Sequence, residues 1–127
     1  MRSRELVLVV DDDQGMLRAV ERLLTVRGYA VEAFSTVNSF MRSGKLAGAA
    51  RLVLDINLNG VSGIELKRQL TRAGASLPTI FITAQEDSAT RQAASDAGCI
   101  AYLTKPFASQ DLVDAIEGCA RSLARKF

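Results

Sequence analysis

The sequence alternates short apolar runs with amphipathic stretches, and this alternation restricts the fold more than any other feature. The apolar runs are four to six residues long and span 6–10, 29–34, 52–55, 79–83 and 99–103. Most are rich in leucine and β-branched residues, as are strands buried on both faces of a parallel sheet. Because each run leads through a short connection into a helical stretch, right-handed strand–helix–strand crossovers are expected. The sequence therefore predicts an α/β fold, with a linker at 45–50 and a loop at 57–63.

The amphipathic stretches predict five helices. They are expected to span 14–27, 37–43, 64–73, 88–97 and 110–125, the last of them capped by Ser109. Ser35 or Thr36 can cap the second helix through its hydroxyl oxygen. In the third helix, Glu65, Lys67 and Arg68 are expected on the charged face that points to water.

The composition indicates a single domain and excludes several kinds of function. With 127 residues and 48% hydrophobic content, the chain can bury one core at about 5–123, within one domain of 1–127. A net charge of +2 is too small to indicate binding to nucleic acid or to an acidic membrane. The absence of histidine largely excludes Ser-His-Asp triads and the common zinc sites. Cys99 and Cys119 have no pairing or metal-ligand spacing, and no stretch resembles a signal peptide or membrane span, so we expect a cytoplasmic protein.

Polar side chains follow four of the five apolar runs. They are Asp11 and Asp12, Asp55, Thr83 and Lys105. The carboxyl ends of parallel strands share one edge of a sheet, where open α/β folds bind ligands. If the first and third runs are neighbours, three carboxylates crowd together, and each like-charged pair costs about 4 kcal/mol at 4 Å and an effective dielectric of 20. Such a cluster needs a cation, and hard oxygen ligands favour Mg²⁺.

This set of groups is suited to accepting a phosphoryl group. The Asp55 carboxylate can act as the nucleophile, the metal and Lys105 can neutralise the phosphoryl oxygens, and the Thr83 hydroxyl can orient one of them. The simpler interpretation is that Asp55 only caps the loop or helix after it, because aspartate is a common turn residue. The agreement of four separate strand ends favours a site.

Four segments of the chain resemble the receiver domains of two-component response regulators. They are Val9-Val10-Asp11-Asp12, Leu54-Asp55 with Gly60 and Gly63, Ile82-Thr83-Ala84, and Tyr102-Leu103-Thr104-Lys105-Pro106-Phe107. The resemblance covers roughly 5–123. It implies a doubly wound (βα)5 fold, a flavodoxin-like three-layer sandwich whose five-stranded parallel sheet has the order 2-1-3-4-5.

The resemblance also implies a role for each acidic residue. Asp55 would accept a phosphoryl group from a phosphohistidine of a sensor histidine kinase, from a phosphotransfer protein or from a small phosphodonor. Asp12 would be a direct ligand of Mg²⁺, or of Mn²⁺ in its place. Asp11 would act partly through water, and Asn57 would contribute its backbone carbonyl.

The remaining motif residues receive roles in the same way. Thr83 and Lys105 would hold the phosphoryl oxygens, and the bond before Pro106 would be cis, as X–Pro bonds tolerate. Tyr102 matches the aromatic residue that moves inward as the threonine shifts, although it could equally be a strand residue that covers the sheet. Gln85 and Asn57 flank the approach of a hydrolytic water and would set the lifetime of the phosphorylated state.

The chain departs from the family pattern at two positions. Asn59 stands where the family often has proline, so we expect a looser loop after the third strand. Asp13 is a third acidic residue beside the pair, and we interpret it as a favourable charge at a helix N-terminus.

The helix at 88–97 offers only alanines to the core, so it should be among the less stable elements and able to move. The resemblance implies that it forms, with the fifth strand and the last helix, an altered output face that can also dimerise.

A kinase would dock near 14–18 and Phe107. A DNA-binding output domain can follow such a domain in the native protein. The domain itself would be a regulator, not an enzyme, catalysing only its own phosphorylation and dephosphorylation.

Three other functions compete with this interpretation, and the sequence argues against each. A Mg²⁺-dependent phosphatase with an aspartyl-phosphate intermediate needs an acid two residues after the nucleophile, where this chain has Asn57. A flavodoxin-like cofactor binder needs a phosphate-binding Ser/Thr/Gly loop after the first strand, where this chain has three acids. A receiver-like module that is not phosphorylated and serves only protein contacts would not need the full set of motif residues.

Overall fold

The central sheet has five parallel strands in the order β2-β1-β3-β6-β7. The computed structural model describes residues 4–85 and 87–117. Its central strands are β1 (Leu6–Val10), β2 (Ala30–Phe34), β3 (Ala49–Asp55), β6 (Thr79–Thr83) and β7 (Ala101–Thr104). Since β6 and β7 are the fourth and fifth strands of this sheet, the predicted order 2-1-3-4-5 is confirmed.

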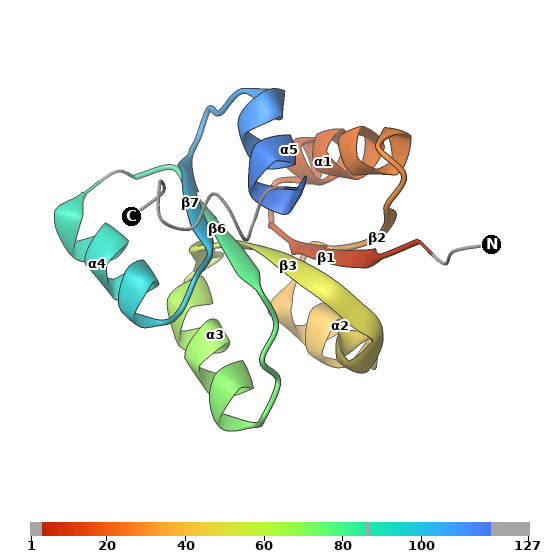
Figure 1. Ribbon diagram of the computed structural model, residues 1–127. Coiled ribbons are helices and arrows are strands. Elements are labelled where there is room, and N and C mark those ends of the chain that lie inside the picture. The colour runs from red at the N-terminus through yellow and green to blue at the C-terminus, as the bar shows by residue number, and fades with distance from the viewer. Residues whose placement is uncertain (1–3, 86, 118–127) are drawn as a thin grey trace.

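Helices cover both faces of the sheet and complete a three-layer sandwich (Figure 1). They are α1 (Gln14–Val26), α2 (Val37–Met41), α3 (Gly63–Arg72), α4 (Ser88–Asp96) and α5 (Ser109–Glu117), with a 3-10 turn at Leu46–Gly48. α1 and α5 lie on one face, and α2, α3 and α4 lie on the other. The predicted α/β fold class is therefore confirmed. Within the described ranges, no helix has the length and apolar character that crossing a bilayer requires.

Alternate residues of each central strand enter the two halves of the core. In β1, Leu8 and Val10 pack toward α2 and α3, whereas Val7 and Val9 pack toward α1 and α5. This follows from the two-residue period of a strand, which directs successive side chains to opposite faces. β1 is buried from Val7 to Val10, β3 from Leu52 to Asp55, and β6 along its whole length, whereas β2 at the sheet edge is half-buried and carries Glu32. The sheet is thus a rigid base for whatever its carboxyl edge carries.

Side-chain caps determine where most helices begin. The oxygens of four residues accept a hydrogen bond from the backbone N–H three residues ahead: Asp13, Thr36, Ser62 and Asp87. Thr36, not Ser35, caps α2. Asp13 caps α1, which agrees with its interpretation as a charge at a helix N-terminus.

The segment predicted as a loop after Asp55 is a β-hairpin, so that prediction was wrong. β4 (Asn57–Leu58) pairs with β5 (Val61–Ser62) in antiparallel fashion. Asn59 and Gly60 form the turn with φ angles of 56° and 90°. Positive φ at both central positions defines a type I′ turn, for which Asn-Gly is the preferred sequence. Proline cannot adopt this positive φ. Asn59 therefore forms an ordered turn that proline could not form, and the expected looser loop is not present.

Lys67 is buried, which contradicts its expected place on the exposed face of the third helix. Its Nζ donates a hydrogen bond of 2.8 Å to the carbonyl oxygen of Leu77. Burial lowers the pKa of Lys67. The residue borders the apolar stripe of α3, and its four-carbon stem lets the amine reach a carbonyl under the helix.

Several element boundaries also differ from the predictions. The expected linker at 45–50 contains the 3-10 turn and the first residues of β3, and β7 begins at Ala101 instead of Cys99. Ser109 is the first helical residue of α5. The predicted helical residues Cys119 and Leu123, and the expected end of the helix near Arg125, lie outside the described residues.

Gly63 provides a test of how tightly α3 is joined to the end of β3. A Cβ atom on Gly63 would collide with the backbone carbonyl oxygen of Asp55. We expect Gly63→Ala to lower the free energy of unfolding by about 3 kcal/mol, the upper range for overpacking a well-packed site. Urea unfolding would measure this change.

Gly48→Ala is the matched control, because a Cβ there meets nothing within 4 Å. We expect its free energy of unfolding to stay close to that of the wild type. A Gly63→Ala variant as stable as the Gly48→Ala variant would contradict the close approach.

Candidate functional site

The carboxyl ends of four neighbouring strands bring the predicted site residues to one edge of the sheet. Asp11 follows β1, Asp55 ends β3, Thr83 ends β6, and Lys105 follows β7. These four strands are consecutive in the sheet and run in the same direction. Residues that are up to 94 positions apart in the chain, from Asp11 to Lys105, therefore meet at one edge.

Three carboxylates form the acidic part of the site. Asp11, Asp12 and Asp55 each offer an oxygen, and these oxygens all lie within 4.8 Å of one another. Asp11 and Asp55 are buried, whereas Asp12 is exposed. Like charges this close repel strongly in a partly desolvated setting, so the cluster requires nearby positive charge.

Lys105 supplies part of that positive charge. Its Nζ lies 3.0 Å from Oδ2 of Asp11 and 3.3 Å from Oδ2 of Asp55. Its backbone N–H donates a hydrogen bond of 2.7 Å to the carbonyl oxygen of Thr83, and its peptide bond to Pro106 is cis. The hydrogen bond to Thr83 thus fixes the backbone of Lys105 at the end of β7, with its ammonium group between the two buried carboxylates.

Burial and charge together determine the ionisation of this site. Burial is the largest cause, and the Asp11 carboxylate the next, of a pKa of Asp55 raised to about 6. The Asn57 N–H and Lys105 oppose this rise without cancelling it. For Lys105, burial works against the charged form, but the two carboxylates outweigh it and raise the pKa. Asp55 is therefore mostly ionised at neutral pH, but only against a cost in desolvation.

The arrangement of acidic oxygens fits a hard divalent cation. Oδ1 of Asp11 accepts a hydrogen bond of 2.9 Å from the Asp13 N–H, and Oδ1 of Asp55 accepts one of 3.2 Å from the Asn57 N–H. Oδ2 of Asp11 is buried, and the Lys105 ammonium lies 3.0 Å from it. An incompletely satisfied carboxylate beside two others is the donor set that oxygen-binding cations use.

Asn57 and Gln85 occupy the rim of the site, and the side chains of both are exposed. Oδ1 of Asn57 accepts a hydrogen bond of 3.3 Å from the Gly60 N–H, which ties it to the turn of the hairpin. Gln85 contributes its backbone: its N–H donates to Oγ1 of Thr83 over 3.1 Å. Thr83 itself is buried at the sheet edge.

Tyr102 lies inside the core cluster and is linked to the site through Gln85. Its hydroxyl donates a hydrogen bond of 3.3 Å to the Gln85 carbonyl oxygen. The guanidinium carbon of Arg91 lies 4.7 Å from the centre of its ring. Sequence analysis did not single out Arg91, although a lone arginine among the alanines of α4 was a signal that it makes a specific contact.

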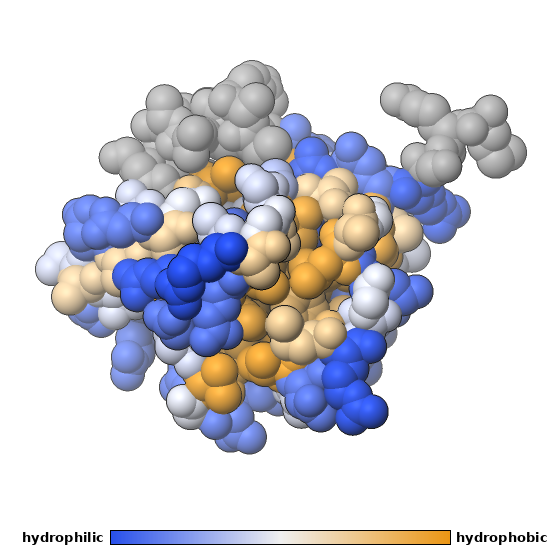
Figure 2. Space-filling view, turned by 90° about the horizontal axis from the view of Figure 1, so that it is seen from below, coloured by the Kyte–Doolittle hydropathy of each residue, from blue (hydrophilic) through white to orange (hydrophobic). Residues whose placement is uncertain are grey.

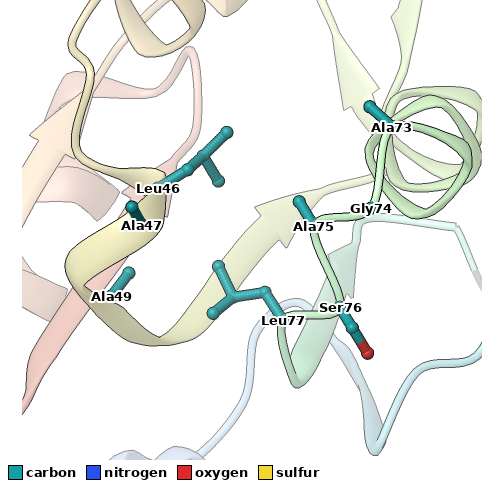
Figure 3. Close-up of a pocket in the computed structure, with 8 residues that line it drawn as sticks. All are labelled: Leu46, Ala47, Ala49, Ala73, Gly74, Ala75, Ser76 and Leu77. Carbon is teal, nitrogen blue, oxygen red and sulfur yellow. The ribbon is translucent and has the colours of Figure 1, made fainter.

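A separate cavity lies away from these residues. It has a volume of about 420 Å³ and is lined mainly by small apolar residues, among them Leu46, Ala49, Ala75 and Leu77 (Figure 3). Figure 2 shows apolar side chains gathered around a hollow on the face seen from below. Ala49 begins β3 and Leu77 precedes β6, so this cavity is at the amino ends of the strands. Its lining holds no charged side chain, and it is not part of the acidic site.

Comparison with known proteins gives consistent matches. A sequence profile described as "Response regulator receiver domain" matches residues 7–117. The chain is 31% identical over 115 residues to the response regulator protein TodT of Pseudomonas putida, covering 91% of this chain and 51% of TodT. It is 36% identical over 116 residues to the transcriptional regulatory protein KdpE of Mycobacterium tuberculosis, covering 91% of this chain and 51% of KdpE. The chain thus spans about half the length of the curated relatives it matches.

Solved structures with the same fold give a similar result. The "BeF3 Activated DrrB Receiver Domain" superposes with a TM-score of 0.84 and 26% identity, covering 93% of this chain and 98% of that one. The response regulator StyR superposes with a TM-score of 0.83 and 38% identity, covering 97% of this chain and 62% of that one.

The raised pKa of Asp55 predicts how stability depends on pH without added metal. The folded carboxyl takes up a proton near pH 6, whereas its ordinary pKa is 3.8, so stability is lost as the pH rises through this window. We expect Asp55→Asn to raise the free energy of unfolding at pH 7.5 by about 3 kcal/mol, since a pKa raised from 3.8 to about 6 corresponds to about 1.4 kcal/mol for each pKa unit.

Urea unfolding in the presence of EDTA at pH 7.5 and pH 4.5 would measure the gain. At pH 4.5 it should shrink, because the wild-type carboxyl is then mostly protonated in the folded state. Asp114→Asn on the exposed side of α5 is the control and should show no such pH-dependent gain. An equal gain at both pH values would contradict the raised pKa.

Proposed function

The chain belongs to the response regulator receiver domain family, and from this premise we propose that it is a switch phosphorylated on Asp55. The observation that carries the proposal is the position of the Asp55 carboxylate, 3.3 Å from the Lys105 ammonium and beside two further acids. The donor would be a phosphohistidine of a sensor histidine kinase, a phosphotransfer protein or a small phosphodonor. The domain would regulate, and catalyse only its own phosphorylation and dephosphorylation.

The chemistry assigns one task to each side chain. An oxygen of ionised Asp55 forms the new bond to phosphorus while the bond from phosphorus to the donor breaks, and the leaving group takes the electron pair. Lys105 neutralises charge on the phosphoryl oxygens, and the Thr83 hydroxyl donates a hydrogen bond to one of them. The raised pKa of Asp55, about 6, still lies below neutral pH, so the carboxylate is mostly ionised there, as a nucleophile must be.

Three acids and one carbonyl would hold the metal that this family uses. They are Asp11, Asp12, Asp55 and the backbone carbonyl of Asn57. The chemistry that Mg²⁺ supplies when bound, or Mn²⁺ in its place, is neutralisation of charge on the phosphoryl oxygens during transfer. The crowded carboxylates favour this assignment, because a cation offsets their repulsion.

The output would be a shift between two arrangements of the α4–β7–α5 face. Thr83 and Tyr102 are the proposed switch residues, and both contact Gln85 at the start of the segment that leads to α4. α4 contributes the small side chain of Ala94 to the buried core, so little apolar area holds it in place. Phosphorylation would then act as a population shift, and dimerisation could use the same face.

A kinase or phosphotransfer protein would dock beside the acceptor. A groove of about 170 Å³ lies between α1 and the segment after β7, lined by apolar residues that include Met16, Val20 and Phe107.

We propose one domain over 1–127 with its core at 5–123, working in the cytoplasm. The full protein would carry an output domain, as the greater length of its relatives suggests, and this domain itself would not bind nucleic acid.

Phosphorylation by a small donor tests the proposal directly. We expect incubation with acetyl phosphate and Mg²⁺ to add the mass of one phosphoryl group, measured on the intact protein. EDTA or the Asp55→Asn substitution should prevent the addition. A wild-type protein that stays unmodified, while a known receiver domain is phosphorylated in the same assay, would favour the non-phosphorylated interaction module.

The rim residues predict the lifetime of the phosphorylated state. Asn57 and Gln85 are uncharged and can orient the attacking water, so Asn57→Ala or Gln85→Ala should slow phosphate loss about fivefold, as expected for one lost hydrogen bond. Decay of the phosphorylated mass over time gives the rate. Gln110→Ala, on the exposed face of α5, should decay like the wild type. Unchanged decay in both rim variants would show that these side chains do not set the lifetime.

A further inference from the structure

We propose that Arg91 is a positioning residue that holds Tyr102 in its buried orientation and so sets the resting balance of the switch. This inference rests on the proposed function, because it concerns the affinity of the Asp55 site for a phosphoryl group. It assigns to α4 a specific attachment to the sheet through one cation and one ring.

The contact between Arg91 and Tyr102 has the geometry of a cation–π interaction. The guanidinium carbon lies 4.7 Å from the ring centre, within the range in which the ring attracts a cation. Arg91 is half-buried, so water screens the interaction only in part. Arginine suits this position because its planar group can stack on an aromatic face.

The contact is important because α4 has few other large groups to attach it. Ala94 is the buried residue of the helix, and Ala93 and Ala97 pack against the core at its edge. Three methyl groups bury little area compared with a guanidinium that covers an aromatic ring. The position of α4 and the orientation of Tyr102 are therefore expected to change together.

Tyr102 in turn is connected to the phosphorylation site. Its hydroxyl donates to the Gln85 carbonyl oxygen over 3.3 Å, and the Gln85 N–H donates to Oγ1 of Thr83 over 3.1 Å. A continuous series of contacts thus leads from Arg91 to the hydroxyl that would hold a phosphoryl oxygen. If the ring moved outward, both the hydroxyl contact and the stacking on Arg91 would be lost.

The energetic consequence follows from linkage. A group that stabilises one of two conformations raises the affinity of any ligand that prefers the same conformation. Tyr102 is buried in the structure, with 5% of the residue exposed. Arg91 therefore favours the conformation in which Tyr102 points inward. Removal of the Arg91 side chain should weaken the binding of a phosphoryl mimic at the Asp55 site.

The experiment measures the apparent affinity of the full chain for beryllofluoride in the presence of Mg²⁺, by titration followed with NMR. We expect Arg91→Met to weaken the apparent affinity about fivefold, the size of a partly desolvated cation–π contact. Arg91→Lys, which keeps the charge, should recover part of the loss. Arg68→Met, which removes an exposed arginine of α3, is the control and should bind like the wild type.

A second background separates positioning from general stabilisation. In Tyr102→Leu, which has no ring, Arg91→Met should cause no further loss, whereas in Tyr102→Phe the fivefold loss should persist. An unchanged affinity in Arg91→Met, or an equal loss in the Tyr102→Leu background, would overturn the inference. Beryllofluoride binding that fails in the wild type, or that survives Asp55→Asn, would instead overturn the proposed function and the inference with it.

Discussion

The ammonium group of Lys105 lies between the buried carboxylates of Asp11 and Asp55, and the proposed chemistry of the protein depends on this arrangement. One lysine cannot neutralise three acids, so the cluster keeps an excess of negative charge at the edge of an otherwise apolar sheet. Burial makes that charge costly, which is why the pKa of Asp55 rises to about 6. A site that is unfavourable when empty of counter-charge is well suited to binding a cation and then a phosphoryl group.

The two faces of the sheet support this site in different ways. α1 and α5 bury leucine, valine and isoleucine side chains against the strands, and they hold the sheet edge rigid. On the other face α3 packs firmly through Ile64, Leu66 and Leu70, whereas α4 offers little more than alanine. The acidic cluster therefore sits on buried strands, and the helix with least apolar attachment lies next to the proposed switch residues Thr83 and Tyr102.

The hairpin after Asp55 shows how the rim of the site is held in place. Its Asn59-Gly60 turn, the side-chain contact of Asn57 with Gly60, and the close approach of Gly63 to Asp55 constrain a segment of only a few residues. The backbone that carries the proposed acceptor is thereby held from both sides, by β3 before it and by α3 after it. This constraint keeps the carboxylate directed toward Lys105.

Much of the fold and of the candidate site was predictable from the sequence, because both depend on local patterns. The apolar period located the strands, the capping candidate Thr36 located the start of α2, and the motif residues pointed to one sheet edge. The Asn-Gly turn was also present in the sequence but was not recognised as a hairpin. By contrast, the burial of Lys67 under α3, the stacking of Arg91 on Tyr102 and the raised pKa of Asp55 were decided only by tertiary structure. Each of these depends on desolvation and on neighbours from distant parts of the chain, and no local pattern of residues encodes such surroundings.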